Sequence, residues 1–309
     1  MTVRPSIDSP RSSKSNPTTP AEWTVGSQVM APLRRSLDLL ARALPLAMLA
    51  ALLPTAPTLC SAASAESLSE RKATEQELGT AIYDNLKAQR VIIESSPLYD
   101  VLTPISSAIV RAAQPRYYLP IKVWLVHAAQ PNAFATPGGN VFVTDELLYF
   151  AKNREELAGT LCHEVSHLIH EDSMELAEKQ ERLLRRELGA TILLGPSARN
   201  VLAITLIGKL QSLRYSRDVE SRADLTGADV CASAGFNPWG LVWLFGAFES
   251  SQSIERPAFL SDHPDNQSRI DALKQQFAAN PQRFGQFSSE ETSASPIAIP
   301  KKAPVVFLR

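Results

Sequence analysis

The chain has 309 residues, of which 44% are hydrophobic and 20% are charged. This is enough apolar material for one large domain or two small ones, and it excludes disorder throughout. The 31 basic and 32 acidic residues nearly cancel, which excludes a global attraction to nucleic acid or acidic lipid. With five histidines and three cysteines, a disulfide scaffold and a multi-cysteine zinc module are also excluded.

The beginning of the chain is typical of a leader. Residues 1–29 are polar and rich in Ser, Pro and Thr, which indicates disorder. From Met30 there follow a basic segment, an apolar run over 43–53 and small residues ending at Ala65. This order predicts a secretory signal peptide over 30–65 and an exported, periplasmic protein. An uncleaved anchor or a buried helix is the alternative, and Met30 is also a candidate start codon.

The next part of the chain predicts helices and then a small sheet. Apolar residues recur at near-helical spacing over 66–90 and over 99–113. The period changes to strand-like alternation over 121–126, and a short strand is predicted at 141–143, after a Gly-Gly-Asn turn signal. A small sheet between two helical blocks indicates an α+β domain, for which we take residues 66–285.

The following predicted helix carries the chemistry. It contains His163, Glu164 and His167 in the pattern H-E-x-x-H. Residues four apart lie on one helix face, so both imidazoles can bind one metal ion. Zinc held by neutral imidazoles lowers the pKa of a bound water toward about 7, and Glu164 can accept its proton. A surface helix with unliganded histidines is the alternative. The largely apolar flanks disfavour it and predict one zinc ion per chain.

A catalytic zinc site needs a third protein ligand and one open position. Glu220 and Asp224 are four residues apart and share one face of a later predicted helix. Glu220 could bind the metal while Asp224 holds a ligand imidazole by its other nitrogen. Taken alone, a solvated charged helix face explains these two acids better.

Four sequence pieces resemble a known family. They are residues 132–139, residues 156–167 with H-E-x-x-H, Glu220-x-x-Ala-Asp224, and residues 262–270. In this order they resemble the gluzincin metallopeptidases that include HtpX, the CAAX prenyl protease and BepA. The resemblance covers about residues 78–273 and implies a mainly helical zincin-type domain. Its small β-sheet would have an edge strand that borders the active site.

The resemblance assigns a role to each residue around the metal. The zinc ligands would be His163, His167 and Glu220. Glu164 would be the general base, and Asp224 would orient a ligand histidine.

The resemblance also implies residues that meet the substrate. Asn132, Ala133 and Phe134 would lie on the edge strand, where a peptide substrate pairs through backbone hydrogen bonds. His263 and Arg269 match a pair near the metal on a mobile loop. In BepA-like relatives the matching histidine can occupy the fourth zinc position and hold the enzyme inactive. His263 could instead donate to the oxyanion with Arg269 adding positive charge, and a plain surface turn is the simplest alternative.

Several segments set the chain apart from membrane-embedded relatives. The apolar stretches at 191–194 and 201–206 are interrupted by Gly, Pro and Arg, so neither reaches the roughly 20 residues of a membrane span. We expect them in the core or in a wall of the substrate cleft, and a membrane-apposed hairpin stays open. Residues 286–309 are expected to form a flexible tail, in which 303–308 could add a strand.

Cys162 and Cys231 are predicted to be two buried thiols. Cys231 lies eleven residues past Glu220, about 16 Å along the predicted helix, so a bridge to a cysteine beside a zinc ligand is not expected.

Together these observations predict a secreted zinc-dependent metalloendopeptidase acting on misfolded or unassembled cell-envelope proteins. Its partners would be polypeptide substrates and not nucleic acid. A peripheral association with a membrane or with outer-membrane assembly machinery stays open. The alternative is an envelope chaperone or assembly factor whose zinc site is held inactive by the His263 loop. Glu164 favours the enzyme, since a purely structural zinc site needs no base.

Overall fold

The structure is a computed structural model. It describes residues 68–188, 196–210, 215–250 and 266–301, together with Phe259 and His263. The predicted leader of residues 1–65 and the apolar segments at 191–194 and 303–308 lie outside the described residues.

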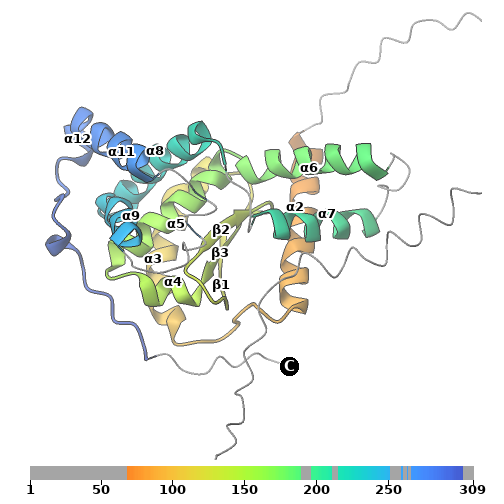
Figure 1. The fold of residues 1–309 in the computed structure, drawn as a ribbon, viewed down its shortest axis with the longest axis horizontal. Helices are drawn as coiled ribbons and strands as arrows, with labels where there is room; N and C mark the ends of the chain where they lie inside the picture. The colour runs from red at the N-terminus through yellow and green to blue at the C-terminus, as the bar shows by residue number, and fades with distance from the viewer. Residues whose placement is uncertain are drawn as a thin grey trace, which may run out of the picture. The chain divides into compact units, whose positions relative to one another are not determined.

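The described part of the chain is mainly helical and contains one small sheet, which confirms the α+β prediction (Figure 1). The helices are α2 (Leu68–Ala88), α3 (Leu98–Ala113), α4 (Asp145–Phe150), α5 (Arg154–Ile169), α6 (Asp172–Leu188), α7 (Pro196–Leu210), α8 (Arg217–Ala234), α9 (Trp239–Ser250), α11 (Asn266–Ala279) and α12 (Pro281–Phe284). Short 3-10 turns are η1 (Gln114–Arg116) and η3 (Glu291–Ser293). Of these described helices, none has both the length and the apolar character to span a membrane.

The sheet has three strands in the order β1-β3-β2. β1 (Lys122–Val126) runs parallel to β3 (Asn140–Thr144), and β2 (Ala133–Thr136) pairs antiparallel with the other side of β3. All four residues of β2 are buried, and its sequence, Ala-Phe-Ala-Thr, lacks the alternation of apolar and polar residues that would predict a strand. β2 is therefore an edge strand that owes its conformation to its pairing with β3.

Helix α5 lies at the centre of the main hydrophobic core. Every residue from Glu155 to Leu168 is buried, and α5 packs against α3, α8, α9 and β2 (Figure 1). The helix begins after Asn153, whose side chain accepts a hydrogen bond from the N–H of Glu156. A Cβ at Gly159 would lie 2.6 Å from the backbone nitrogen of Leu241, so only glycine admits α9 at this distance. The centre of the domain is thus a helix with no exposed face.

A second hydrophobic cluster joins α2, α6 and α7 to the other face of the sheet. Phe134 of β2 and Phe142 of β3 stack with ring centroids 5.2 Å apart and belong to this cluster. From α7, Leu206 and Ile207 are buried in it. The apolar stretch at 201–206 therefore contributes to a core, which was one of the two expectations for it.

The segment after α12 differs from the expected flexible tail. The backbone N–H of Arg154 donates to the carbonyl of Ser295 (3.0 Å), and the N–H of Ser295 donates to Glu155 (2.8 Å). Ile297 and Ile299 pack against the main core. The first turn of a helix has backbone N–H groups without helical partners, and this segment supplies one acceptor. Its Ser- and Pro-rich composition gave no sign of these contacts.

Buried Glu75 ties α2 to the turn between β2 and β3. Its carboxylate accepts hydrogen bonds from the hydroxyls of Tyr117 and Tyr118 and from the N–H of Gly138 (3.3 Å). Burial and the neighbouring Glu75 raise the pKa of both tyrosines, so both stay protonated and donate. A Cβ at Gly79 of α2 would lie 2.4 Å from the carbonyl oxygen before this turn. Helix and turn are therefore in backbone contact.

We predict that Glu75→Ala lowers the free energy of unfolding by about 3 kcal/mol, because it leaves two tyrosine hydroxyls without their acceptor in a largely buried site. Urea unfolding followed by circular dichroism measures the loss. Glu77→Ala on the exposed side of the same helix is the control and should stay within about 0.5 kcal/mol of the parent. Equal stability of the two variants would contradict this role.

Candidate metal centre

Four buried side chains from three parts of the chain direct their donor atoms at one point. His163 and His167 belong to α5, Glu220 belongs to α8, and His263 lies shortly before α11. One nitrogen or oxygen of each lies within 4.8 Å of the corresponding atom of every other. The structure thus brings together the three predicted zinc ligands and the predicted fourth histidine.

The spacing of these atoms suits a tetrahedral metal ion. Nε2 of His163 lies 3.1 Å from Nε2 of His167, 3.2 Å from Nδ1 of His263 and 3.4 Å from Oε2 of Glu220. Nδ1 of His263 lies 2.8 Å from Oε1 of Glu220. Around a tetrahedral zinc with bonds of about 2.0–2.1 Å, neighbouring ligand atoms are about 3.3 Å apart. The donor set fits zinc in number, chemistry and size.

Two carboxylates orient the imidazoles of α5. Nδ1 of His163 lies 2.9 Å from Asp224, and Nδ1 of His167 lies 2.8 Å from Asp172. Each carboxylate accepts the Nδ1 hydrogen, so each Nε2 turns a lone pair toward the other. Two lone pairs at 3.1 Å repel each other unless a proton or a metal ion lies between them. The orientation of both rings therefore favours a bound cation.

The pKa shifts of the donor groups also favour a cation at this point. Burial lowers the pKa of His263 to about 4 and also lowers the pKa of His167, so both remain neutral ligands. Burial alone would lower the pKa of His163, but its hydrogen bonds to Asp224 and Glu220 raise it to about 9. Burial likewise opposes ionisation of Glu220, yet the surrounding histidines and Arg269 hold its pKa well below the usual range. The cluster thus stabilises a positive charge beside an ionised carboxylate.

Glu164 lies beside the donor set and is held by the edge strand. Its Oε2 accepts a hydrogen bond from the N–H of Ala135 (2.9 Å) in β2. Its Oε1 is buried, lacks a hydrogen-bond partner among the described residues, and lies 3.4 Å from Nε2 of His263. Burial raises the pKa of Glu164 to about 8. A carboxylate with these properties can accept and release a proton near neutral pH.

Arg269 binds the acids around the histidines. Its guanidinium donates to both carboxylate oxygens of Asp224 (2.7 and 2.6 Å) and to the carbonyl of His263 (3.0 Å). It also lies 3.0 Å from Oε2 of Glu220 and packs over the ring of Phe245. The structure therefore places Arg269 against the ligand-orienting groups, where it neutralises buried negative charge.

The three predicted substrate-binding residues lie on or next to β2, but they differ in orientation. The carboxamide oxygen of Asn132 accepts a hydrogen bond from the N–H of Ala133 (2.8 Å). Ala133 belongs to the main core together with α5, whereas the ring of Phe134 belongs to the second cluster on the opposite face of the sheet. The structure thus brings the backbone of this strand to Glu164, but it does not bring the ring of Phe134 there.

The sequence analysis missed Asp172 and Tyr215. Asp172 orients His167 and also accepts a hydrogen bond from Arg222 of α8, while the ring of Tyr215 stacks on His167 with centroids 4.5 Å apart. The sequence offered one signal for the first of these, namely an acidic residue, Asp172, five residues after His167. It meets the imidazole because the chain leaves the helical conformation at Glu171, whose φ is 58°, between the end of α5 and the beginning of α6.

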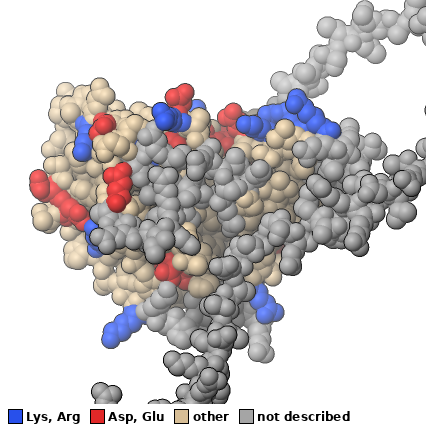
Figure 2. Space-filling view, in the orientation of Figure 1, with Lys and Arg blue, Asp and Glu red and all other residues tan. Residues whose placement is uncertain are grey.

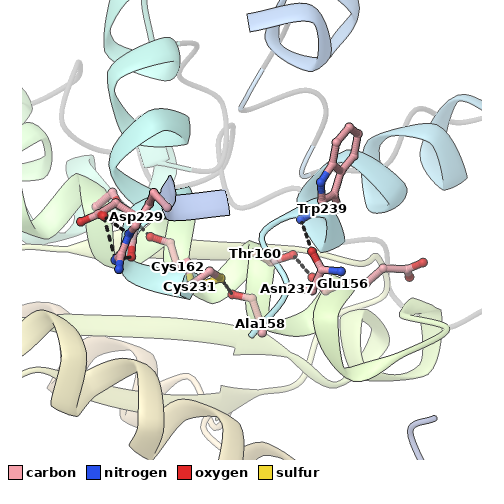
Figure 3. Close-up of a disulfide and its surroundings, with 10 residues drawn as sticks. Glu156, Ala158, Thr160, Cys162, Asp229, Cys231, Asn237 and Trp239 are labelled. Atoms are coloured by element: carbon pink, nitrogen blue, oxygen red, sulfur yellow. Dashed lines mark hydrogen bonds and ion pairs between the residues drawn. A yellow bond between two sulfur atoms is a disulfide. The ribbon is translucent and has the colours of Figure 1, made fainter. Parts of the chain in front are cut away.

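The prediction of two free thiols was wrong, because Cys162 and Cys231 form a disulfide with Cα atoms 5.7 Å apart (Figure 3). The prediction used the distance along α8 from Glu220 to Cys231 and assumed that α5 and α8 are in contact only at the metal. The two backbones instead approach each other at Gly227, where a Cβ would lie 3.1 Å from the backbone of Cys162. Cys231 lies one turn farther, about 6 Å along the helix, and so reaches Cys162. The disulfide joins the two helices that carry His163 and Glu220.

Comparison with known proteins gives a family for this arrangement. The profile of peptidase family M48 matches residues 102–276, more than half of the chain. The matched residues include all four donor residues, Glu164, and the groups that orient the histidines.

The individual relatives have low sequence identity to this chain. The beta-barrel assembly-enhancing protease of Yersinia pestis is 26% identical over 252 residues, which cover 74% of this chain and 52% of that protein. The protein of the same name from Escherichia coli is 25% identical over 206 residues, covering 63% of this chain and 42% of the relative. The mitochondrial metalloendopeptidase OMA1 of Schizosaccharomyces pombe is 28% identical over 160 residues, covering 49% and 46%. The chain spans about half the length of these relatives.

We predict that Asp172→Ala weakens zinc binding about 10–100-fold, because His167 loses the acceptor that fixes its tautomer and ring orientation. Competition between the metal-free protein and a fluorescent zinc chelator measures the affinity. Asp84→Ala, on the exposed side of α2, is the matched control and should bind zinc like the parent. Unchanged affinity in Asp172→Ala would show that this carboxylate does not support a metal ligand.

Proposed function

The chain belongs to peptidase family M48, as its four sequence motifs predicted, and we propose that it is a zinc-dependent endopeptidase. One observation carries this proposal. Glu164 presents a buried carboxylate oxygen, for which the described part of the chain supplies no hydrogen-bond partner, beside four donor atoms that have the spacing of a zinc site. A structural zinc site has no use for such a group, whereas peptide hydrolysis needs a base there.

The residues of this site would either bind the metal ion or orient the residues that bind it. His163, His167 and Glu220 would bind zinc, and Asp172 and Asp224 would keep the two imidazoles in the tautomer that zinc requires. When bound, zinc supplies a Lewis acid that polarises the scissile carbonyl and makes a water molecule acidic near neutral pH.

Glu164 would move the proton. Its Oε2 is fixed by the N–H of Ala135, so its Oε1 has a defined position from which to accept the proton of the attacking water. The protonated carboxyl then delivers that proton to the nitrogen of the leaving amine, and Glu164 returns to its ionised form. The pKa of about 8 that burial gives this carboxyl suits both transfers.

The edge strand β2 would align the substrate. Because Ala135 donates to Glu164 and not to β3, the backbone groups of Ala133 and Ala135 point away from β3. An extended peptide can pair with this edge through main-chain hydrogen bonds. The N–H of Ala133 is bound by the side chain of Asn132, so that side chain would turn to admit a substrate carbonyl.

The proposed substrates are misfolded or unassembled proteins of the cell envelope, and the proposed compartment is the periplasm, reached by export. The predicted signal peptide supports export, and the relatives from Yersinia pestis and Escherichia coli are named for β-barrel assembly. No nucleic acid is part of this proposal.

One observation favours a second candidate, an envelope chaperone or assembly factor with an inactive zinc site. Nδ1 of His263 lies 2.8 Å from Glu220 and 3.2 Å from His163, where it completes a four-atom donor set. A catalytic site keeps one position open for water and substrate. In this geometry the position is filled, and cleavage would require the segment that carries His263 to move.

We predict that Glu164→Gln lowers the rate of casein cleavage about 100-fold or more, because the amide cannot accept a proton from water. Zinc content measured by mass spectrometry should stay unchanged, since Glu164 is not a ligand. Glu290→Gln, an exposed carboxylate after α12, is the matched control and should cleave like the parent. Retained cleavage in Glu164→Gln would refute the proposed base.

The role of His263 has a test of its own. We predict that His263→Ala raises casein cleavage severalfold while zinc stays bound by the other three ligands, because the fourth position becomes open. Gln267→Ala, exposed on α11, is the control. Slower cleavage with full zinc content would instead assign His263 to the oxyanion. No cleavage by either the parent or His263→Ala, again with full zinc content, would favour the chaperone.

A further inference from the structure

The hairpin of α6 and α7 exposes apolar side chains. In the described part of the chain, four large hydrophobic residues are exposed, and three of them lie on these two helices. Leu183 of α6 is 40% exposed, and Val201 and Ile204 of α7 are 43% and 44% exposed. The opposite side of α7 is buried against α2 and α6. One face of the hairpin is thus packed, and the other offers apolar surface to the surroundings.

Basic side chains accompany this apolar surface. Arg182, Arg185 and Arg186 are exposed near the end of α6, and Figure 2 shows Lys and Arg gathered over this helix. Arg182 and Arg185 form ion pairs with acids four residues earlier, but exposed pairs of this kind contribute little and can exchange partners. From Asp172 to Leu210 the sequence has six basic and five acidic residues, but the part from Arg182 to Ile204 has four basic residues and one acidic residue. The excess of positive charge is therefore local to the part of the hairpin from Arg182 to Ile204, which also carries the exposed apolar side chains.

From these observations we propose that the hairpin docks on the surface of an anionic lipid bilayer. The docking surface, which we call the α6–α7 surface, consists of Arg182, Leu183, Arg185, Arg186, Val201 and Ile204. Exposed apolar side chains on a basic amphipathic element enter the boundary between headgroups and acyl chains, and arginines bind the lipid phosphates. Neither property alone would select a membrane. Their combination on one hairpin of an otherwise acidic chain matches the charge and polarity of an anionic bilayer.

Docking at this place would hold the metal centre near the membrane. Asp172, the first residue of α6, binds His167, and Tyr215, which follows α7 after a few residues, stacks on the same ring. Both ends of the hairpin therefore contact a proposed zinc ligand. Polypeptides at or emerging from the bilayer surface would then be the substrates nearest to the edge strand β2.

Sedimentation with lipid vesicles tests the proposal on the full chain. Vesicles of phosphatidylglycerol and phosphatidylcholine are compared with vesicles of phosphatidylcholine alone. The double variant Val201→Asp/Ile204→Asp places charge on the apolar part of the α6–α7 surface, and Arg182→Ala/Arg186→Ala removes positive charge. Leu68→Asp changes a hydrophobic residue outside the surface that is even more exposed, at 63%, and is the control. The apolar run at 43–53 is present in every protein, so differences between variants report on the hairpin.

The parent chain and Leu68→Asp should bind the anionic vesicles, more weakly as salt is raised, and should bind phosphatidylcholine vesicles less. Each double variant should lose about tenfold or more in apparent affinity, with unchanged circular dichroism and zinc content. Absence of parent binding to anionic vesicles would overturn the proposal, and so would equal binding of parent and double variants. A parent dimer that Val201→Asp/Ile204→Asp dissociates would instead make this surface an interface between copies. These readouts do not depend on peptidase activity.

Discussion

The close approach of α5 and α8 is the constraint on which the metal centre depends. At Gly227 the two backbones are so near that a side chain would press on Cys162 and His163. The disulfide to Cys231 holds the helices together one turn farther along α8. Glu220 lies on the other side of Gly227, toward the beginning of α8. Its side chain reaches across to α5, where Oε2 lies 3.4 Å from Nε2 of His163. A larger distance between the helices would separate the Glu220 carboxylate from the two imidazoles of α5.

This approach buries charged groups that must satisfy one another. Four carboxylates, from Glu164, Asp172, Glu220 and Asp224, surround the histidines and are nearly inaccessible to water. The guanidiniums of Arg269 and Arg222 bind three of them. Isolated buried charges are costly, so the ionised carboxylates need a positive charge among the histidines, which a proton or a metal ion can supply. A divalent metal ion between the histidines would supply this positive charge. The Nε2 atoms of His163 and His167, which face each other, also favour a cation between them.

Much of this arrangement was predictable from the sequence because it rests on short-range periodicity. Helical spacing predicted α2 and α3, alternation predicted β1, and the four-residue spacing of His163 and His167 placed both on one face of α5. The role of Asp172 was not predictable in this way, since its contact with His167 requires the helical conformation to be interrupted at Glu171. The disulfide was missed for a related reason. Helical rise gives distances along one helix, but not the point at which two helices approach each other.

The position of the α6–α7 hairpin has a consequence for the metal centre. The hairpin connects α5 to α8 in the chain, and its two ends place Asp172 and Tyr215 on different sides of one imidazole, His167. Of the four donor residues, His167 is therefore the one that contacts both ends of the hairpin. His263 approaches the same donor set from the α11 side and is bound there by Glu220 and Arg269. A force on the hairpin would thus act on the site independently of the His263 segment. Contacts of the hairpin surface and movements of the His263 segment would therefore affect the proposed zinc site through different residues.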